Sequence, residues 1–223
     1  MALKIAWVSI VLLLIGEAVM QAQKLPPAFR CARLKYSGGG DWYNDPSAVP
    51  NLMRFIKEKT GIATPEKEEI VEAASPNIFQ YRFVFMTGHG NVRFTEAELE
   101  NLRNYLKAGG FIYVDDDYGM DKSFRREVKR LFSGTDLVEL PYSHPIFNIF
   151  FKFPNGVPKT HEHDNQPPKT FGLFYNNRLV LLYTYESNPS DGWANPEIHN
   201  DPPEKREEAL QFGTNVVLYA ITQ

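Results

Sequence analysis

Three consecutive aspartates, Asp115, Asp116 and Asp117, follow the apolar stretch 111–114 and are the residues of this chain best placed to do chemistry. A second polar group, Thr-Gly-His-Gly at 87–90, follows the apolar stretch 81–86. Open α/β sheets bind ligands outside the carboxyl ends of their strands. We therefore predict a polar site at that edge of a sheet, to which His89 and the three aspartates contribute.

The same residues are suited to a divalent metal ion, because carboxylate oxygens bind hard cations and His89 could add a nitrogen. The segment His-Glu-His-Asp at 161–164 places two imidazoles two apart, so an extended backbone would turn both to the same side. The predicted ligand set is His89, Asp115, Asp116, His161 and His163. Two alternatives remain open: the carboxylates cap the next helix or bind loop amides, and a proline-bounded loop accounts for 161–164.

The glycine-rich loop 38–43, Gly-Gly-Gly-Asp-Trp-Tyr, follows another strand-like stretch. Asp41 and Trp42 join the predicted ligand site, although Trp42 could equally pack the loop. The loop lacks the Lys-Ser/Thr of a P-loop and the spaced glycines of a dinucleotide site, so it does not indicate nucleotide binding. Farther along, Glu186, Asp191 and His199 lie in a polar stretch that could reach the same edge.

The hydrophobic pattern predicts the elements that would hold these residues. Strand-like stretches at 29–36, 68–73, 81–86 and 111–114 are separated by helical ones at 45–61, 95–109 and 121–132. Asp45 is the expected N-cap of the first helix, with Pro46 at its first position, and Thr95 and Glu98 form a capping box for the second. Strands 81–86 and 111–114 are expected to be parallel, which would place His89 beside the acidic run.

The rest of the chain completes this fold class. Residues 141–168 are rich in proline and show no regular period, 171–185 are typical of a hairpin that turns at Asn176-Asn177, and a helix follows from 201 to 219. We predict an α/β three-layer sandwich with a mainly parallel central sheet, plus a C-terminal hairpin and helix.

Composition limits the classes of protein to consider. The chain of 223 residues is 43% hydrophobic, which suits one globular domain over residues 23–223. Lys4 precedes an apolar run from Ile5 to Ile15, so residues 1–22 resemble a signal peptide and predict an exported protein, periplasmic or secreted, or membrane-anchored if the segment is not cleaved. No transmembrane span is expected in the mature chain. The net charge of -3 indicates no nucleic-acid partner.

Five segments together resemble the bacterial family named domain of unknown function 4159, over nearly all of the chain after residue 22. They are 38–43, 87–90, 109–116, 118–121 and 161–164. The wider resemblance is to the class I glutamine amidotransferase-like fold, a flavodoxin-like parallel sheet. Enzymes of that group carry a nucleophilic cysteine on a tight turn after a strand. Asp115 to Asp117 occupy the nearest position here, and Cys31 lies far away, so cysteine-dependent amidotransferase activity is not expected.

These observations predict a non-catalytic domain that binds a small molecule or a protein partner of the envelope at the carboxyl edge of its sheet. A metal-dependent hydrolase is the first alternative, in which Glu162 or a free carboxylate activates water. A structural component of a cell-envelope assembly is the second. An assembly component would expose apolar surface, whereas a hydrolase would have a deep polar pocket.

Overall fold

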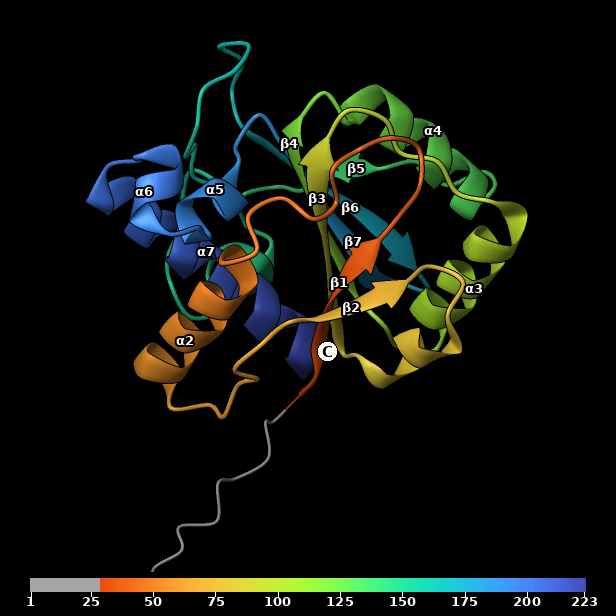
Figure 1. The fold of residues 1–223 in the computed structure, drawn as a ribbon, viewed down its shortest axis with the longest axis horizontal. Coiled ribbons are helices and arrows are strands. Elements are labelled where there is room, and N and C mark those ends of the chain that lie inside the picture. Colours follow the sequence, from red (N-terminus) through yellow and green to blue (C-terminus); the bar gives the residue numbers. More distant parts are fainter. Residues whose placement is uncertain (1–28) are drawn as a thin grey trace, which may run out of the picture.

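The computed structural model describes residues 29–223, so the predicted signal segment 1–22 lies outside the described residues. These residues form a seven-stranded sheet in the order β2-β1-β3-β4-β7-β6-β5 (Figure 1). The strands are β1 (Cys31–Lys35), β2 (Glu69–Glu72), β3 (Phe83–His89), β4 (Ile112–Tyr118), β5 (Val138–Glu139), β6 (Lys169–Tyr175) and β7 (Arg178–Tyr185). From β2 to β7 all neighbours are parallel, and β6 and β5 then add antiparallel pairs. The predicted mainly parallel sheet is confirmed.

Helices cover both faces of this sheet (Figure 1). One face carries α3 (Glu96–Lys107) and α4 (Asp121–Leu131), and the other carries α2 (Ala48–Thr60), α5 (Pro189–Trp193) and α7 (Pro203–Thr222). The short α6 (Pro196–His199) follows α5, and single 3-10 turns, η1 (Pro76–Gln80) and η2 (Pro145–Phe147), lie in the connections. The long final helix was expected from the sequence.

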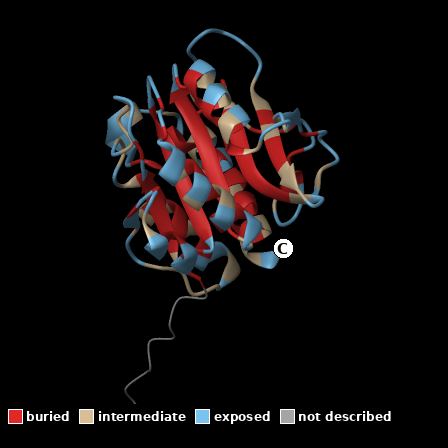
Figure 2. Cartoon of the chain, turned by 90° about the vertical axis from the view of Figure 1, so that its right-hand side faces the viewer, coloured by how far each residue is buried: buried red, intermediate tan, exposed pale blue. Residues whose placement is uncertain are grey.

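Two hydrophobic clusters fill the space between the sheet and its helices. Leu102, Phe124 and Val114 belong to the cluster beneath α3 and α4. Phe85 and Trp193 belong to the cluster beneath α2, α5 and α7. Figure 2 shows the central strands buried along most of their length, because a parallel sheet that is covered on both faces leaves neither face to water.

Local sequence features set several of the element ends. The capping box of α3 is confirmed, because Thr95 Oγ1 accepts from the Glu98 backbone N–H and the Glu98 carboxylate accepts from the Thr95 N–H at 2.7 Å. The α2 prediction was wrong at its start. Helix α2 begins at Ala48, after Ser47, and Asp45 has a left-handed backbone with φ of 46°. The Asp45 side chain contacts His199 instead of capping the helix.

The hairpin of β6 and β7 turns at Asn176 and Asn177, as predicted. Both asparagines have positive φ, 49° and 62°. This is the backbone that two-residue hairpin turns of type I′ require, and asparagine tolerates it better than most residues.

Strand β4 is longer than the hydrophobic pattern suggested. It was expected to end at Val114, but it continues to Tyr118 and takes the acidic run into the sheet. Its partner β3 also extends past its apolar part, so that Thr87 lies beside Asp115 and Gly88 beside Asp116. Backbone pairing with β3 therefore sets the positions of the aspartates.

Between Phe29 and the C-terminus, no helix has both the length and the apolar character needed to cross a membrane.

Candidate functional site

The three aspartates of β4 point to opposite faces of the sheet, because side chains alternate along a strand. Asp115 and Asp117 contact residues of the α5 segment, whereas Asp116 contacts the first turn of α4 and Tyr183. All three are at least 97% buried, with exposed fractions of 0%, 3% and 2% in chain order. One compact cluster of three carboxylates is therefore not formed.

Asp115 is held by donors from two other elements. Its Oδ1 accepts from Thr184 Oγ1 at 2.5 Å, and its Oδ2 accepts from the Ser190 N–H and Oγ at 2.8 and 2.6 Å. Burial nevertheless raises the pKa of Asp115 to about 7. Both oxygens are thus engaged in joining β4 to β7 and α5.

Asp116 ties the end of β4 to the start of α4. Its Oδ1 accepts from the Met120 N–H at 2.9 Å, and its Oδ2 accepts from the Tyr183 hydroxyl at 3.0 Å. Burial raises the pKa of Asp116 to about 6. The alternative that a carboxylate of the run binds loop amides therefore describes Asp116 well.

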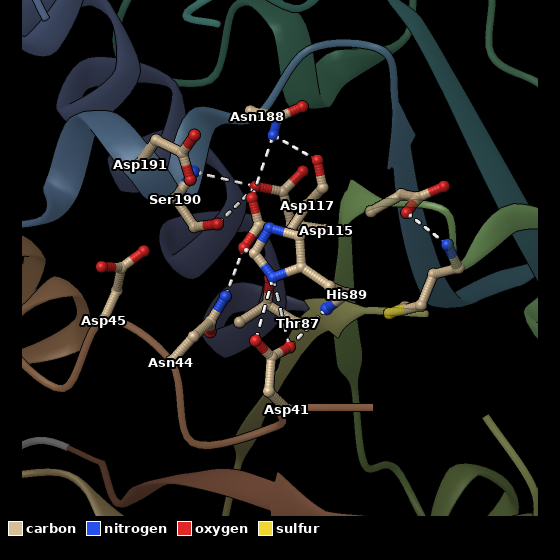
Figure 3. A network of polar contacts seen from close by, with 12 residues as sticks. Asp41, Asn44, Asp45, Thr87, His89, Asp115, Asp117, Asn188, Ser190 and Asp191 are labelled. Carbon is tan, nitrogen blue, oxygen red and sulfur yellow. Dashed lines mark hydrogen bonds and ion pairs between the residues drawn. The ribbon is translucent and has the colours of Figure 1, made fainter. Parts of the chain in front are cut away.

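Asp117 lies at the centre of a polar network at the carboxyl edge (Figure 3). Asn188 Nδ2 donates to its Oδ1 at 3.1 Å, Asn44 donates to its Oδ2, and His89 Nδ1 lies 3.4 Å from the same Oδ2. Burial raises the pKa of Asp117, and His89 opposes this shift. The loop after β1, the last residue of β3 and the loop after β7 thus meet at one carboxylate.

His89 is positioned by Asp41, so the structure brings these two residues of the predicted ligand site together. The His89 backbone N–H donates to Asp41 Oδ1 at 2.5 Å, and its Nδ1 lies 3.0 Å from Asp41 Oδ2. Burial acts to raise the pKa of Asp41, but these contacts outweigh it and hold the pKa below its usual value. Gly88 leaves room for Tyr36 and Asp41 to lie close to β3, because a Cβ at this position would lie 2.3 Å from the Tyr36 hydroxyl.

Buried Arg33 holds the loop that carries Asn44 and Asp45. Its guanidinium donates to the carbonyl oxygens of Trp42, Asn44 and Asp45 at 3.2, 2.6 and 3.1 Å. Trp42 itself packs against the hydrophobic cluster beneath α3 and α4. Of its two predicted roles, this contact matches the packing one.

The segments 159–164 and 186–201 cover the other side of the network. The His163 imidazole stacks on Tyr118 with 4.5 Å between centroids, and its Nε2 lies 2.9 Å from Asn188 Nδ2. Glu186 and Asn188 both have positive φ, 55° and 48°. Asparagine tolerates such a backbone, but in glutamate it costs energy, and such strained residues cluster at functional sites.

A pocket of about 320 Å³ opens at this edge, between the ends of β4 and β7. Its lining includes the acidic residues Asp116, Asp117, Asp121, Asp164 and Glu186. The rings of Tyr118, Tyr185 and His163 also line it, together with Lys122. Burial lowers the pKa of His163, which favours its neutral form.

A second group of side chains, Asp45, Asp191 and His199, lies next to the Asp117 network. They bring one ligand atom each to within 4.8 Å of one another. His161 lies next to them, with its Nδ1 3.9 Å from Asp191 Oδ2. Of the predicted ligand set, His161 is therefore beside this group, His89 and His163 contact the Asp117 network, and Asp115 and Asp116 have the separate partners given above. That set stays a prediction.

Sequence reasoning missed part of the site. Asn44, Ser190 and Asn188 gave no signal, because single polar residues in loops have no period or spacing to mark them. Asp45 was noticed only as a helix cap. The suggestion that Asp191 and His199 reach the same edge is confirmed, since both lie beside the contacts of Asp117.

Cys31 is 2% exposed in β1, and burial raises the pKa of its thiol to about 12. The turn after β4 begins at Gly119, which has φ of 77°, and Met120 follows. Neither place offers a thiolate.

Comparison with known proteins gives the family and nothing more specific. No curated protein matches the chain. Residues 30–221, which are nearly all of the described part, match the family called domain of unknown function (DUF4159). The chain therefore belongs to the DUF4159 family.

Proposed function

We propose that this domain binds a small ligand rich in hydrogen-bond donors, an amine or a polyhydroxylated compound, in the pocket at the carboxyl edge of β4 and β7. The observation that carries the proposal is the composition of the pocket wall. The described lining residues include five acidic residues and one lysine, and tyrosine rings offer flat apolar surface. Carboxylates accept hydrogen bonds and attract cations, whereas they repel phosphates and carboxylates.

The contacts within the wall support a binding role over a reactive one. The Tyr183 hydroxyl lies 3.0 Å from Asp116 Oδ2 and 2.9 Å from Asp121 Oδ1 and shares its one proton between them, and Tyr118 donates to Asp164 at 3.2 Å. These bonds fix the side chains before a ligand arrives, which reduces the entropy lost on binding. Glu186 Oε2 has no hydrogen-bond partner within residues 29–223, although Lys159 Nζ lies 3.5 Å from it, so this oxygen can still accept a hydrogen bond from a ligand.

Calorimetry with a small panel tests this proposal. The panel contains a diamine, a hexose, inorganic phosphate and a dicarboxylate, each titrated into the protein and into its Glu186→Gln variant. We expect the diamine or the hexose to bind and the variant to bind it about tenfold more weakly, through loss of a charge-assisted hydrogen bond. Glu139→Gln is the matched control, because Glu139 is exposed in β5 and pairs with Lys169 at 3.5 Å. Preferential binding of phosphate or dicarboxylate would contradict the proposal.

A metal-dependent hydrolase is the second candidate function. The observation that favours it is the position of His163, a neutral imidazole in the pocket wall, beside Asn188 and the Asp117 network. Asp115 would have to release Thr184 or Ser190 before it could bind an ion. Hydrolysis of ester and phosphoester substrates in the presence of Zn²⁺ or Mn²⁺, and its loss in His163→Ala, would support this function over simple binding.

A structural role in an envelope assembly is the third proposal, and the exposed apolar side chains bear on it. Exposed large side chains include Ile70 on β2, Val138 on β5 and Phe150 in the 141–168 segment. They belong to different elements, and the acidic pocket gives the ligand-binding proposal the more specific support.

We further infer that the fold is of the class I glutamine amidotransferase-like, flavodoxin-like type. The order of the parallel strands, β2-β1-β3-β4-β7, supports this inference, because flavodoxin-like sheets have the order 2-1-3-4-5 and bind their ligands at the carboxyl edge.

Export to the periplasm or the medium also remains a proposal, because it depends on residues 1–22. N-terminal sequencing of the protein from its native host tests it. A mature chain that starts near residue 23 would support cleavage, and an intact N-terminus in the membrane fraction would support an anchor.

A further inference from the structure

Asp45, Asp191 and His199 come from three separate segments and converge beside the Asp117 network. Asp45 precedes α2, Asp191 lies in α5, and His199 ends α6. Asp45 Oδ2 lies 2.9 Å from His199 Nε2, and Asp191 Oδ1 lies 3.9 Å from the same nitrogen. Figure 3 shows Asp45 and Asp191 on the same side of the network.

The Asp191 carboxylate is buried without the contacts that a buried charge needs. Its side chain is 3% exposed, and its Oδ1 has no hydrogen-bond partner among the described residues. In the part of the chain that the structure describes, the basic side chains within 4 Å of it are the imidazoles of His161 and His199, each at 3.9 Å. A buried carboxylate oxygen with no partner is costly, so its presence indicates that something else binds there.

The neighbouring groups add negative charge to the same place. Burial, followed by repulsion from Asp117, Asp115 and Asp45, raises the pKa of Asp191. Nearby, Asp201 Oδ1 lies 3.7 Å from His161 Nδ1, while its Oδ2 has no partner within residues 29–223. A bound cation would offset this concentration of carboxylates.

We propose that Asp45, Asp191 and His199 bind a divalent transition-metal ion of the Mn²⁺ to Zn²⁺ series. Two carboxylates and one imidazole form a mixed oxygen and nitrogen donor set, which suits these ions better than the all-oxygen sites of Ca²⁺ and Mg²⁺. Donors that share a Zn²⁺ lie about 2.0–2.2 Å from it, and therefore within about 4.4 Å of one another. The two separations from His199 Nε2, 2.9 and 3.9 Å, meet this requirement. The donors of Asp45 and Asp191 lie within 4.8 Å of each other, so a small side-chain adjustment brings both to one ion.

His161 is the fourth side chain in reach of this ion. Its ring stands between Asp191 and Asp201, and its centroid lies 6.3 Å from that of His199. His161 belonged to the ligand set that the sequence predicted, whereas Asp45, Asp191 and His199 did not. The site is therefore distinct from that set, and it does not depend on the ligand proposed for the pocket.

A site without an ion is the competing explanation. The hydrogen bond to Asp45 raises the pKa of His199, so a protonated His199 could pair with Asp45 and replace a metal. That arrangement leaves Asp191 Oδ1 without a hydrogen bond, and it predicts no metal affinity at all. Metal titration separates the two explanations.

The experiment measures metal binding to chelator-treated full-length protein by isothermal calorimetry. We expect one equivalent of Zn²⁺ or Mn²⁺ to bind with micromolar affinity or better, and Mg²⁺ to bind more weakly. Asp191→Asn and His199→Ala should each weaken binding by at least about tenfold. His144→Ala and Asp136→Asn are the matched controls, because His144 packs against Tyr219 and Asp136 is exposed in the connection between α4 and β5.

A measurement on the wild-type protein keeps the proposal testable if a variant fails to fold. Co²⁺ replaces Zn²⁺ at nitrogen and oxygen sites, and its visible absorption spectrum reports such coordination. Absence of Zn²⁺, Mn²⁺ and Co²⁺ binding at a metal concentration of 100 µM, about a hundred times the expected dissociation constant, would overturn the proposal. Equal affinity in the wild type and in both ligand variants would overturn it as well. Failure of the wild-type protein to bind the diamine or the hexose, with metal affinity intact, would overturn the proposed function alone.

Discussion

Arg33 forms an ion pair with Glu68 that is almost completely buried at the back of the site, with Nε and Oε1 3.0 Å apart and side chains 1% and 13% exposed. Burial raises the pKa of Glu68, and Arg33 opposes the shift. The same guanidinium supports the carbonyls of the loop that carries Asn44 and Asp45. Loop position and protein stability therefore depend on one side chain.

Replacing Arg33 should unfold the protein more easily. Arg33→Met leaves Glu68 without its partner in a buried place and frees three loop carbonyls. We expect the free energy of unfolding to fall by about 3–5 kcal/mol, as when one member of a buried pair is removed. Urea denaturation measures it. Arg30→Met is the matched control, because Arg30 is also next to β1 and its pair with Glu69 is exposed. An equal loss in the free energy of unfolding in the two variants would show that the buried Arg33 pair contributes no more to stability than the exposed Arg30 pair.

Gly213 in α7 should not tolerate alanine. A Cβ at this position would lie 2.6 Å from Trp193 Cζ2 and 2.8 Å from Leu52 Cδ1. Alanine favours a helix over glycine by about 1 kcal/mol, but overpacking of a core costs about 1–3 kcal/mol. We expect Gly213→Ala to lower the thermal midpoint, whereas Glu208→Ala, on the exposed side of the same helix, should leave it nearly unchanged. A higher midpoint for Gly213→Ala would show that Trp193 has room to move.

Asp116 should make the protein less stable as the pH rises. Burial raises its pKa to about 6 in the folded state, from the ordinary 3.8. Between these values the folded state binds more protons than the unfolded state. The contribution of Asp116 to the free energy of unfolding is therefore complete below about pH 4 and is lost as the pH rises past about 6. Asp116→Asn removes this dependence.

Urea denaturation of the wild type and Asp116→Asn from pH 4 to pH 7.5, with a chelator present, tests this sign. The stability of the variant relative to the wild type should increase with pH, by up to about 3 kcal/mol for the full shift. Other titrating groups are common to both proteins and cancel in the difference. A difference that stays flat, or that decreases with pH, would contradict the assignment.

Cys31 should be unreactive in the folded protein. Its thiol is buried, and its pKa of about 12 leaves almost no thiolate at neutral pH. An aromatic disulfide reagent should therefore label Cys31 at the rate of unfolding, and immediately in urea. Rapid labelling of the native protein would reveal an accessible thiol and reopen cysteine chemistry.

The sequence predicted most of the fold, because the features that form it are local or periodic. The capping box of α3, the Asn176-Asn177 turn and the parallel pairing of β3 with β4 all follow from residues near one another in the chain. The ends of strands were less predictable. The apolar pattern of β4 stops at Val114, while its backbone pairing continues to Tyr118.

The site was less predictable, since its contacts span long stretches of sequence. An aspartate before a proline has the local pattern of a helix cap, yet Asp45 contacts His199, 154 positions farther along. Helix α5, which supplies Ser190 and Asp191, is too short to show a period. The run of aspartates was conspicuous, but only the strand geometry shows that Asp116 faces away from its two neighbours.

The alternation of the aspartates along β4 also fixes how this central strand lines up with its neighbours. A slip by one residue would turn Asp116 toward Ser190 and bring Asp115 and Asp117 together into the layer that contains Tyr183, since such a slip exchanges the two faces of a strand. That layer would then contain two carboxylates, but its hydrogen-bond donors, the Met120 N–H and the Tyr183 hydroxyl, suffice for one. The acidic run therefore helps to determine the strand register, because a sheet with a shifted β4 would be less stable than the native one whether or not a ligand is bound.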